Sequence, residues 1–171
     1  MDPAALEKAF ELYPDVKVVI LVNLYGTPAK LDEICDICKK HNAILIEDAA
    51  ESLGATYKGK QTGTFGLYNA ISFNGNKIIT GSSGGMLLTD DVNAANKARK
   101  WSTQSRENAP WYQHEEVGYN YRMPNINAAL GCAQLENLDK FIASKRQLAL
   151  EYAEYFKNVD DIQFFTEPED T

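Results

Sequence analysis

The sequence predicts an α/β fold: a mostly parallel β-sheet with flanking helices. Two short runs, VKVVILV at 16–22 and AILIED at 43–48, are rich in β-branched residues and almost continuously apolar, a pattern typical of strands covered on both faces. Between them, apolar residues recur at i, i+3, i+4 and i+7 from Leu31, which indicates an amphipathic helix. A strand, a helix and a strand at this spacing predict a right-handed βαβ unit.

Local signals mark where the helices of this unit should begin. Asp2 is a good N-cap residue, and Pro3 fits the first position of a helix near the start of the chain. Thr27 and Pro28 repeat this pair before the amphipathic segment, so we expect the second helix to begin there.

Further elements follow along the chain. They are a hairpin around Gly59, strands at 68–73 and 84–90, a helix at 90–101, two helices or one bent helix within 125–156, and a strand-like start at 163–171. Residues 102–121 are polar and aromatic without a clear period, and a loop of about twenty residues with this aromatic content is typical of a functional segment.

Two parts are expected in the chain. Residues 1–140 should form a partial large domain, and residues 141–171 a long helix followed by the start of a truncated C-terminal small domain. We therefore expect the chain to be the central part of a longer protein.

Composition excludes several classes of function. The net charge of the 171 residues is −7, and no run of Lys or Arg indicates nucleic-acid binding. The longest apolar run is too short for a membrane, and the start of the chain lacks the pattern of a signal peptide. The cysteines, Cys35, Cys38 and Cys132, form no disulfide framework, which indicates a cytoplasmic protein. Cys35 and Cys38 have CxxC spacing, but their place on the apolar helix face favours packing over metal binding.

Candidate site residues gather around two strand ends. In open α/β sheets, ligands lie beyond the carboxyl ends of the strands, where Asp48 ends an apolar run. Asp48 alone could be a structural acid, and the SFNGNK turn that carries Lys77 could be a surface turn. Together with Ser72 they match the needs of pyridoxal phosphate: a lysine for its aldehyde, an acid for its pyridine nitrogen and a hydroxyl for its phosphate.

The motifs in this order resemble those of a known family. They are VNLYGTPAKLDEI, ILIEDAAESLGATYKGKQTGTFG, ISFNGNKIIT, GGMLLTDD, GYNYRMPNINAALGCAQLENLD and KRQLALEYAEYF. The chain resembles the pyridoxal-phosphate-dependent sugar aminotransferases of the DegT/DnrJ/EryC1/StrS group. The resemblance implies part of the large domain of a fold-type I aminotransferase. It also implies amino transfer from glutamate to a nucleotide-linked 4-keto-6-deoxy sugar, for cell-surface polysaccharide or related sugar biosynthesis.

The resemblance also implies a role for each site residue. Lys77 would be the Schiff-base lysine and later the proton carrier. Asp48 would pair with the pyridine nitrogen, and Ala50 would pack on one face of the ring. Glu51 would hydrogen-bond near the ring hydroxyl, and Ser72 would bind the phosphate.

A further residue implies a partner subunit. Asn120 would reach the phosphate of the neighbouring subunit's cofactor, so the resemblance implies a homodimer with a shared active site. Trp111, Tyr112 and His114, in the aromatic loop, would lie near the entrance for the sugar nucleotide.

The chain departs from the family pattern at several points. Glu51 stands where many members have Gln, and Asn23 where many have His. A phosphate nest and a ring-stacking aromatic residue upstream, and a small domain downstream, are not in the chain, so we expect the chain alone to be inactive. Two alternatives remain: a sister sugar 3-dehydratase, which would carry histidine in place of Lys77, and a non-enzymatic receiver-like module, which would need an acidic pair that VNLYG does not offer.

Overall fold

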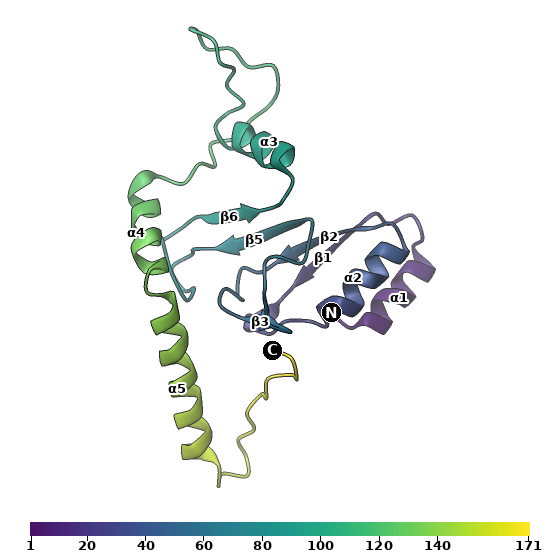
Figure 1. Cartoon of the computed structure of the whole chain (residues 1–171), viewed down its shortest axis with the longest axis vertical. Helices are drawn as coiled ribbons and strands as arrows, with labels where there is room; N and C mark the ends of the chain where they lie inside the picture. Colours follow the sequence, from purple (N-terminus) through teal and green to yellow (C-terminus); the bar gives the residue numbers. More distant parts are fainter.

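The computed structural model describes residues 1–171 and confirms the α/β fold (Figure 1). Its main sheet has four strands, in the order β1 (Val18–Val22), β2 (Ile44–Asp48), β5 (Tyr68–Ser72) and β6 (Gly85–Leu88). The first three are parallel, and β6 is antiparallel to β5. The carboxyl ends of β2 and β5 therefore lie side by side at one edge of the sheet.

The core lies between this sheet and two helices, α1 (Pro3–Leu12) and α2 (Leu31–Lys40). Alternate residues of β1, Val19 and Leu21, are buried against the helices, and Cys38 of α2 lies in the same cluster as predicted. The expectation that β1 is covered on both faces is wrong for this chain. Ile20, which points to the opposite face, is 60% exposed, because both helices pack on one face only.

The predicted start is confirmed for α1 and wrong for α2. Asp2 Oδ1 accepts the Ala5 N–H at 2.9 Å, as an N-cap does. In contrast, α2 begins at Leu31, and Thr27 has extended backbone, the conformation favoured before a proline. A 3₁₀ turn at Leu24–Gly26 takes the place of the expected helical start.

The remaining elements follow the expected order. They are a hairpin of β3 (Thr56–Tyr57) and β4 (Lys60–Gln61), then α3 (Val92–Ser102), α4 (Asn125–Leu135) and α5 (Leu138–Phe156). The segment 125–156 is thus two helices. The predicted strand-like start at 163–171 is wrong, because no neighbouring strand pairs with it. The Glu167 carboxylate instead forms an ion pair with Arg146 of α5.

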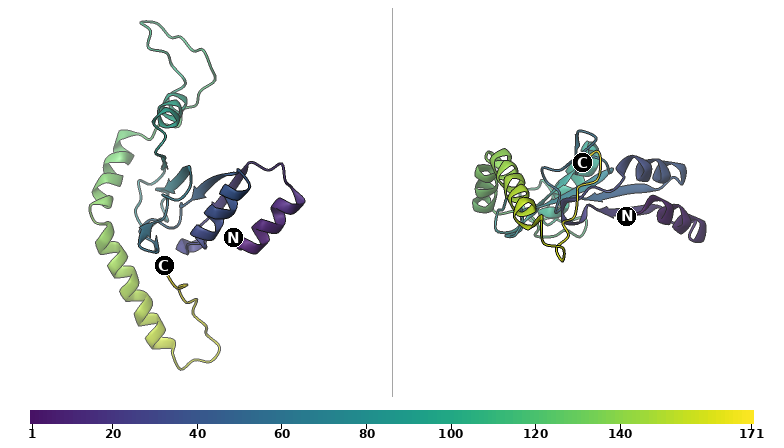
Figure 2. Two further views of the ribbon diagram at one scale, coloured as in Figure 1. Left: turned by 45° about the vertical axis from the view of Figure 1, so that its right-hand side comes forward. Right: turned by 90° about the horizontal axis from the view of Figure 1, so that it is seen from below.

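The later elements lie along one side and at one end of the sheet. In Figures 1 and 2, α4 and α5 follow one another along one side of the molecule, and the loop after α3 projects at one end. None of the helices combines the length and the apolar composition needed to cross a membrane.

Candidate active site

The candidate site lies where β2 and β5 end. Asp48 is the last residue of β2 and Ser72 the last of β5, and Asp48 pairs with Ala70 in the register of the two parallel strands. The segments that follow these strand ends carry the other candidate residues, as the position of ligand sites in such sheets predicts.

A cavity of about 280 Å³ opens at this edge. Four residues proposed from the sequence line it: Ala50, Glu51, Ser72 and Lys77. Four more lining residues were not predicted: Tyr25, Leu53, Asn76 and Ile78. A lysine, a hydroxyl and a carboxylate from separate segments therefore meet in one hollow.

Lys77 lines this cavity with little exposure to solvent. Its side chain is only 17% exposed, and its Nζ lies 3.5 Å from Oε1 of Glu51. Two hydrogen bonds from α4 hold the turn that carries Lys77. The Gln134 side chain accepts the Thr80 N–H at 3.1 Å, and the Asn127 side-chain amide donates to the Gly81 carbonyl. Sequence reasoning missed both helix residues, since each lies about fifty positions from its partner.

Glu51 connects Lys77 to the turn after β1. Its Oε2 accepts the backbone N–H of Tyr25 at 2.7 Å, while its Oε1 faces Lys77. The Tyr25 N–H, and after it the charge of Lys77, hold the pKa of the Glu51 carboxyl below its ordinary value. Glu51 is therefore a carboxylate at neutral pH.

Asp48 and Ser72 make local contacts at the strand ends. Asp48 Oδ1 accepts the Ala50 N–H at 3.0 Å, and Ser72 Oγ accepts the Asn74 N–H at 3.2 Å. Asp48 itself does not line the cavity. Ala50, whose backbone N–H donates to Asp48, does line it. The segment after β2 is thus shaped by Asp48 before any ligand is bound.

A buried polar cluster supports this edge from inside. Glu47 is fully buried, and its carboxylate accepts N–H groups from the Asn23 side chain at 2.8 Å and from the backbones of Gly63 at 2.8 Å and Phe65 at 2.9 Å. The Asn23 amide also lies 3.5 Å from Ser52 Oγ. The sequence signal for this cluster is an acid, Glu47, inside an otherwise apolar strand.

Asn120 is not brought into this cavity. It lies in the loop after α3, where it forms an isolated β-bridge with Thr103. Trp111 and Tyr112 of the same loop are exposed, and so is His114, whose Nδ1 lies 2.9 Å from the Gln104 carbonyl oxygen. The role suggested for Asn120 concerns a neighbouring subunit, so it stays a prediction.

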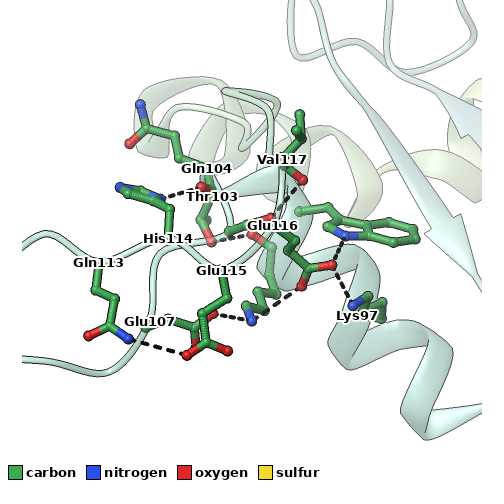
Figure 3. A network of polar contacts seen from close by, with 12 residues as sticks. Lys97, Thr103, Gln104, Glu107, Gln113, His114, Glu115, Glu116 and Val117 are labelled. Carbon is green, nitrogen blue, oxygen red and sulfur yellow. Dashed lines mark hydrogen bonds and ion pairs between the residues drawn. The ribbon is translucent and has the colours of Figure 1, made fainter.

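Charged groups anchor this loop to α3 (Figure 3). The Glu116 carboxylate accepts from Lys97 Nζ at 2.6 Å and from the Trp101 indole at 3.1 Å, and it lies 3.2 Å from Lys100 Nζ. These partners, Lys97 first, lower the pKa of Glu116 to about 2. Lys100 also bonds to Glu107, so both arms of the loop are held to one helix.

Comparisons with known proteins agree with this geometry. The sequence model of the DegT/DnrJ/EryC1/StrS aminotransferase family matches residues 1–171. EpsN of Bacillus subtilis (strain 168), provisionally named a pyridoxal phosphate-dependent aminotransferase, is 50% identical over 98% of this chain and 44% of its own length. GDP-perosamine synthase of Escherichia coli O157:H7 is 42% identical over 85% of this chain and 39% of its own.

Solved structures share the fold. The aminotransferase TlmJ from Streptoalloteichus hindustanus superposes with a TM-score of 0.88 at 27% identity, over 99% of this chain and 48% of that one. GDP-4-keto-6-deoxymannose-3-dehydratase (ColD), solved as a mutant with bound GDP-perosamine, gives a TM-score of 0.79 at 30% identity, over 92% of this chain and 45% of that one.

The chain spans less than half the length of the curated relatives it matches. The family model nevertheless matches every residue of the chain, and this match excludes the receiver-like alternative. The chain belongs to the DegT/DnrJ/EryC1/StrS aminotransferase family.

Proposed function

We propose that this chain carries the cofactor-binding part of a sugar aminotransferase that uses pyridoxal phosphate. The reaction would move an amino group from glutamate to the keto group of a nucleotide-linked 4-keto-6-deoxy sugar. The observation that carries the proposal is the cavity in which Lys77, Ser72 and Ala50 meet at the carboxyl ends of parallel strands. The name GDP-perosamine synthase, borne by a relative, supports a nucleotide-linked sugar as the substrate.

The residues present fit pyridoxal phosphate by their chemistry. A little-exposed lysine amine suits the aldehyde, the Ser72 hydroxyl suits the phosphate, and the methyl of Ala50 leaves room for a flat ring. When bound, this cofactor acts as an electron sink for the bond that breaks at the substrate carbon. Asp48 is the residue proposed for the pyridine nitrogen, and Glu51 the one proposed near the ring hydroxyl.

Lys77 has two tasks in this proposal. Its Nζ is the group that would hold the cofactor covalently, and the same amine would act as the acid and base that moves a proton at the reacting carbon. The Glu51 carboxylate, 3.5 Å away, stabilises the charged amine and limits how far it moves. A well-oriented group of this kind can reach an effective molarity on the order of 10⁵–10⁸ M.

A sugar 3-dehydratase on the same scaffold is the alternative. The fold does not separate the two, since a dehydratase superposes well on this chain. Lys77 favours the aminotransferase, because an amine in the cavity can form the covalent link that the histidine of the dehydratases does not.

Trapping the covalent link tests the proposal. The full-length protein is incubated with pyridoxal phosphate, reduced with borohydride and mapped by peptide mass. We expect the pyridoxyl mark on Lys77 and none in the Lys77→Arg variant. A mark on Lys58 or Lys60 would contradict the site, and Lys60→Arg is the matched control that should keep the mark on Lys77.

Two further proposals concern assembly. Asn120, on the projecting loop, would complete the site of a second subunit in a homodimer. The 171-residue chain by itself is expected to bind the cofactor weakly and to transfer no amino group. A visible spectrum of the isolated chain with pyridoxal phosphate measures cofactor binding, and a glutamate-dependent assay measures amino transfer.

A further inference from the structure

Tyr25 adopts a backbone conformation that bulky residues rarely take. Its φ is 53° and its ψ 27°, in the left-handed region. Other non-glycine residues with positive φ occur in the chain, among them Asn42 and Lys58, but Tyr25 is the only one of them that lines the Lys77 cavity. A strained residue at a candidate site is a reason to look for a function.

The turn is held by its backbone and not by the tyrosine side chain. The Tyr25 N–H donates to Glu51 Oε2 at 2.7 Å, and a Cβ on the next residue, Gly26, would come within 3.1 Å of the Glu51 carbonyl oxygen. The Tyr25 residue is 87% exposed, and its side chain makes no hydrogen bond and no aromatic contact within the chain. Glycine would meet the needs of this turn without strain.

The position of the ring indicates what it could contact. Lys77 and Tyr25 line the same cavity, but the Lys77 side chain is only 17% exposed, whereas Tyr25 is 87% exposed. A second molecule that approaches Lys77 from solvent can therefore contact the exposed tyrosine ring. A tyrosine offers an apolar face with a hydroxyl at its edge, which suits a ring that has apolar faces and polar edges.

We propose that Tyr25 is a specificity-determining residue that binds the sugar ring of the amino acceptor. The inference rests on the proposed function and names the residue that would recognise the second substrate. The Glu51 carboxylate links Tyr25 to Lys77, because one of its oxygens accepts the Tyr25 N–H and the other faces Lys77 Nζ. The sugar ring would thus be held at a fixed distance from the amine.

The test compares Tyr25→Gly and Tyr25→Phe with Asn42→Gly in the full-length protein. Asn42 also has positive φ, at 53°, but follows the C-terminal end of α2 and does not line the cavity, so Asn42→Gly introduces glycine at a similar backbone conformation without touching the site. The KM for the keto sugar and for glutamate and the melting temperature are measured for each variant.

We expect Tyr25→Gly to raise the KM for the keto sugar by about 2- to 13-fold, the range that an aromatic contact of about 0.5–1.5 kcal/mol gives. The KM for glutamate should stay within about twofold, and the melting temperature should not fall, because strain is relieved. Tyr25→Phe should give a smaller rise, and Asn42→Gly should leave both KM values unchanged.

Three results would overturn the inference. An unchanged KM for the keto sugar would show that Tyr25 does not touch it, and a selective rise for glutamate would assign Tyr25 to the donor. A lower melting temperature with equal losses for both substrates would show a structural role. A wild-type protein that aminates no keto sugar, or that carries no mark on Lys77, would instead refute the proposed function and the inference with it.

Discussion

Replacing Glu47 should weaken the whole edge of the sheet that carries the candidate site. This carboxylate is fully buried and has no cationic partner within the chain. It is satisfied by three N–H donors, from the Asn23 side chain and from the backbones of Gly63 and Phe65. Asn23 lies in the turn after β1, whereas Gly63 and Phe65 both lie in the loop before β5, so one side chain of β2 joins these two segments.

The size of the effect follows from these donors. In Glu47→Ala all three lose their acceptor, and a buried unsatisfied group costs about 1–3 kcal/mol, which gives a loss of about 3–9 kcal/mol in the free energy of unfolding. In Glu47→Gln the amide oxygen can still accept two donors, but the NH₂ group then faces the Phe65 N–H, so we expect a loss of about 1–3 kcal/mol. A domain is typically stable by about 5–15 kcal/mol, so the alanine variant should unfold readily.

Urea denaturation followed by circular dichroism measures these losses. Glu33→Gln is the matched control, since Glu33 is exposed and pairs only with Lys30, and its loss should stay below about 1 kcal/mol. If Glu47→Gln lowers the urea midpoint no more than Glu33→Gln does, the buried carboxylate does not hold β2, the turn after β1 and the loop before β5 together, and the reasoning fails.

Three other perturbations have definite expected outcomes. In the full-length protein, Asp48→Asn should keep the hydrogen bond from the Ala50 N–H and the melting temperature but abolish transamination. Activity within a few-fold of wild type would make Asp48 merely structural. Because the folded-state pKa of Glu116 is lowered to about 2 from 4.5, its contribution to loop order is present above pH 4.5 and is lost as the pH falls toward 2. Trp101 fluorescence should report that change, and Glu116→Gln should remove it. Gly118→Ala should release the loop after α3, since a Cβ there would lie 2.2 Å from the Ser105 backbone nitrogen, and limited proteolysis should then cut the loop faster than in wild type.

The strand ends were predictable because their signals are local. The apolar run that stops at Asp48, and the predicted strand at 68–73 that contains Ser72, place both residues near the carboxyl ends of strands without further information. The Lys77 turn followed from its position directly after such a strand. Cavity-lining residues that lie within a few positions of a strand end could therefore be placed from the sequence.

Contacts between distant segments could not be predicted in the same way. The bond from the Tyr25 N–H to Glu51 depends on a left-handed backbone at position 25, which nothing in the residue type favours. The start of α2 was placed too early because Thr27 and Pro28 match a helix start locally. The Asn23 side chain, held by the buried cluster, accepts the Ala29 N–H at 3.3 Å and so favours a turn at that point.

The hydrogen bonds between α4 and the Lys77 turn couple this helix to the candidate Schiff-base lysine. Cys132 is exposed on α4, two positions before Gln134, which holds the turn. The other two thiols are less accessible, because Cys38 is buried and Cys35 partly buried, and this burial raises the pKa of both. A thiol-reactive fluorophore can thus be attached at one position, and its emission would report, in real time, whether cofactor binding at one end of the turn displaces the helix at the other.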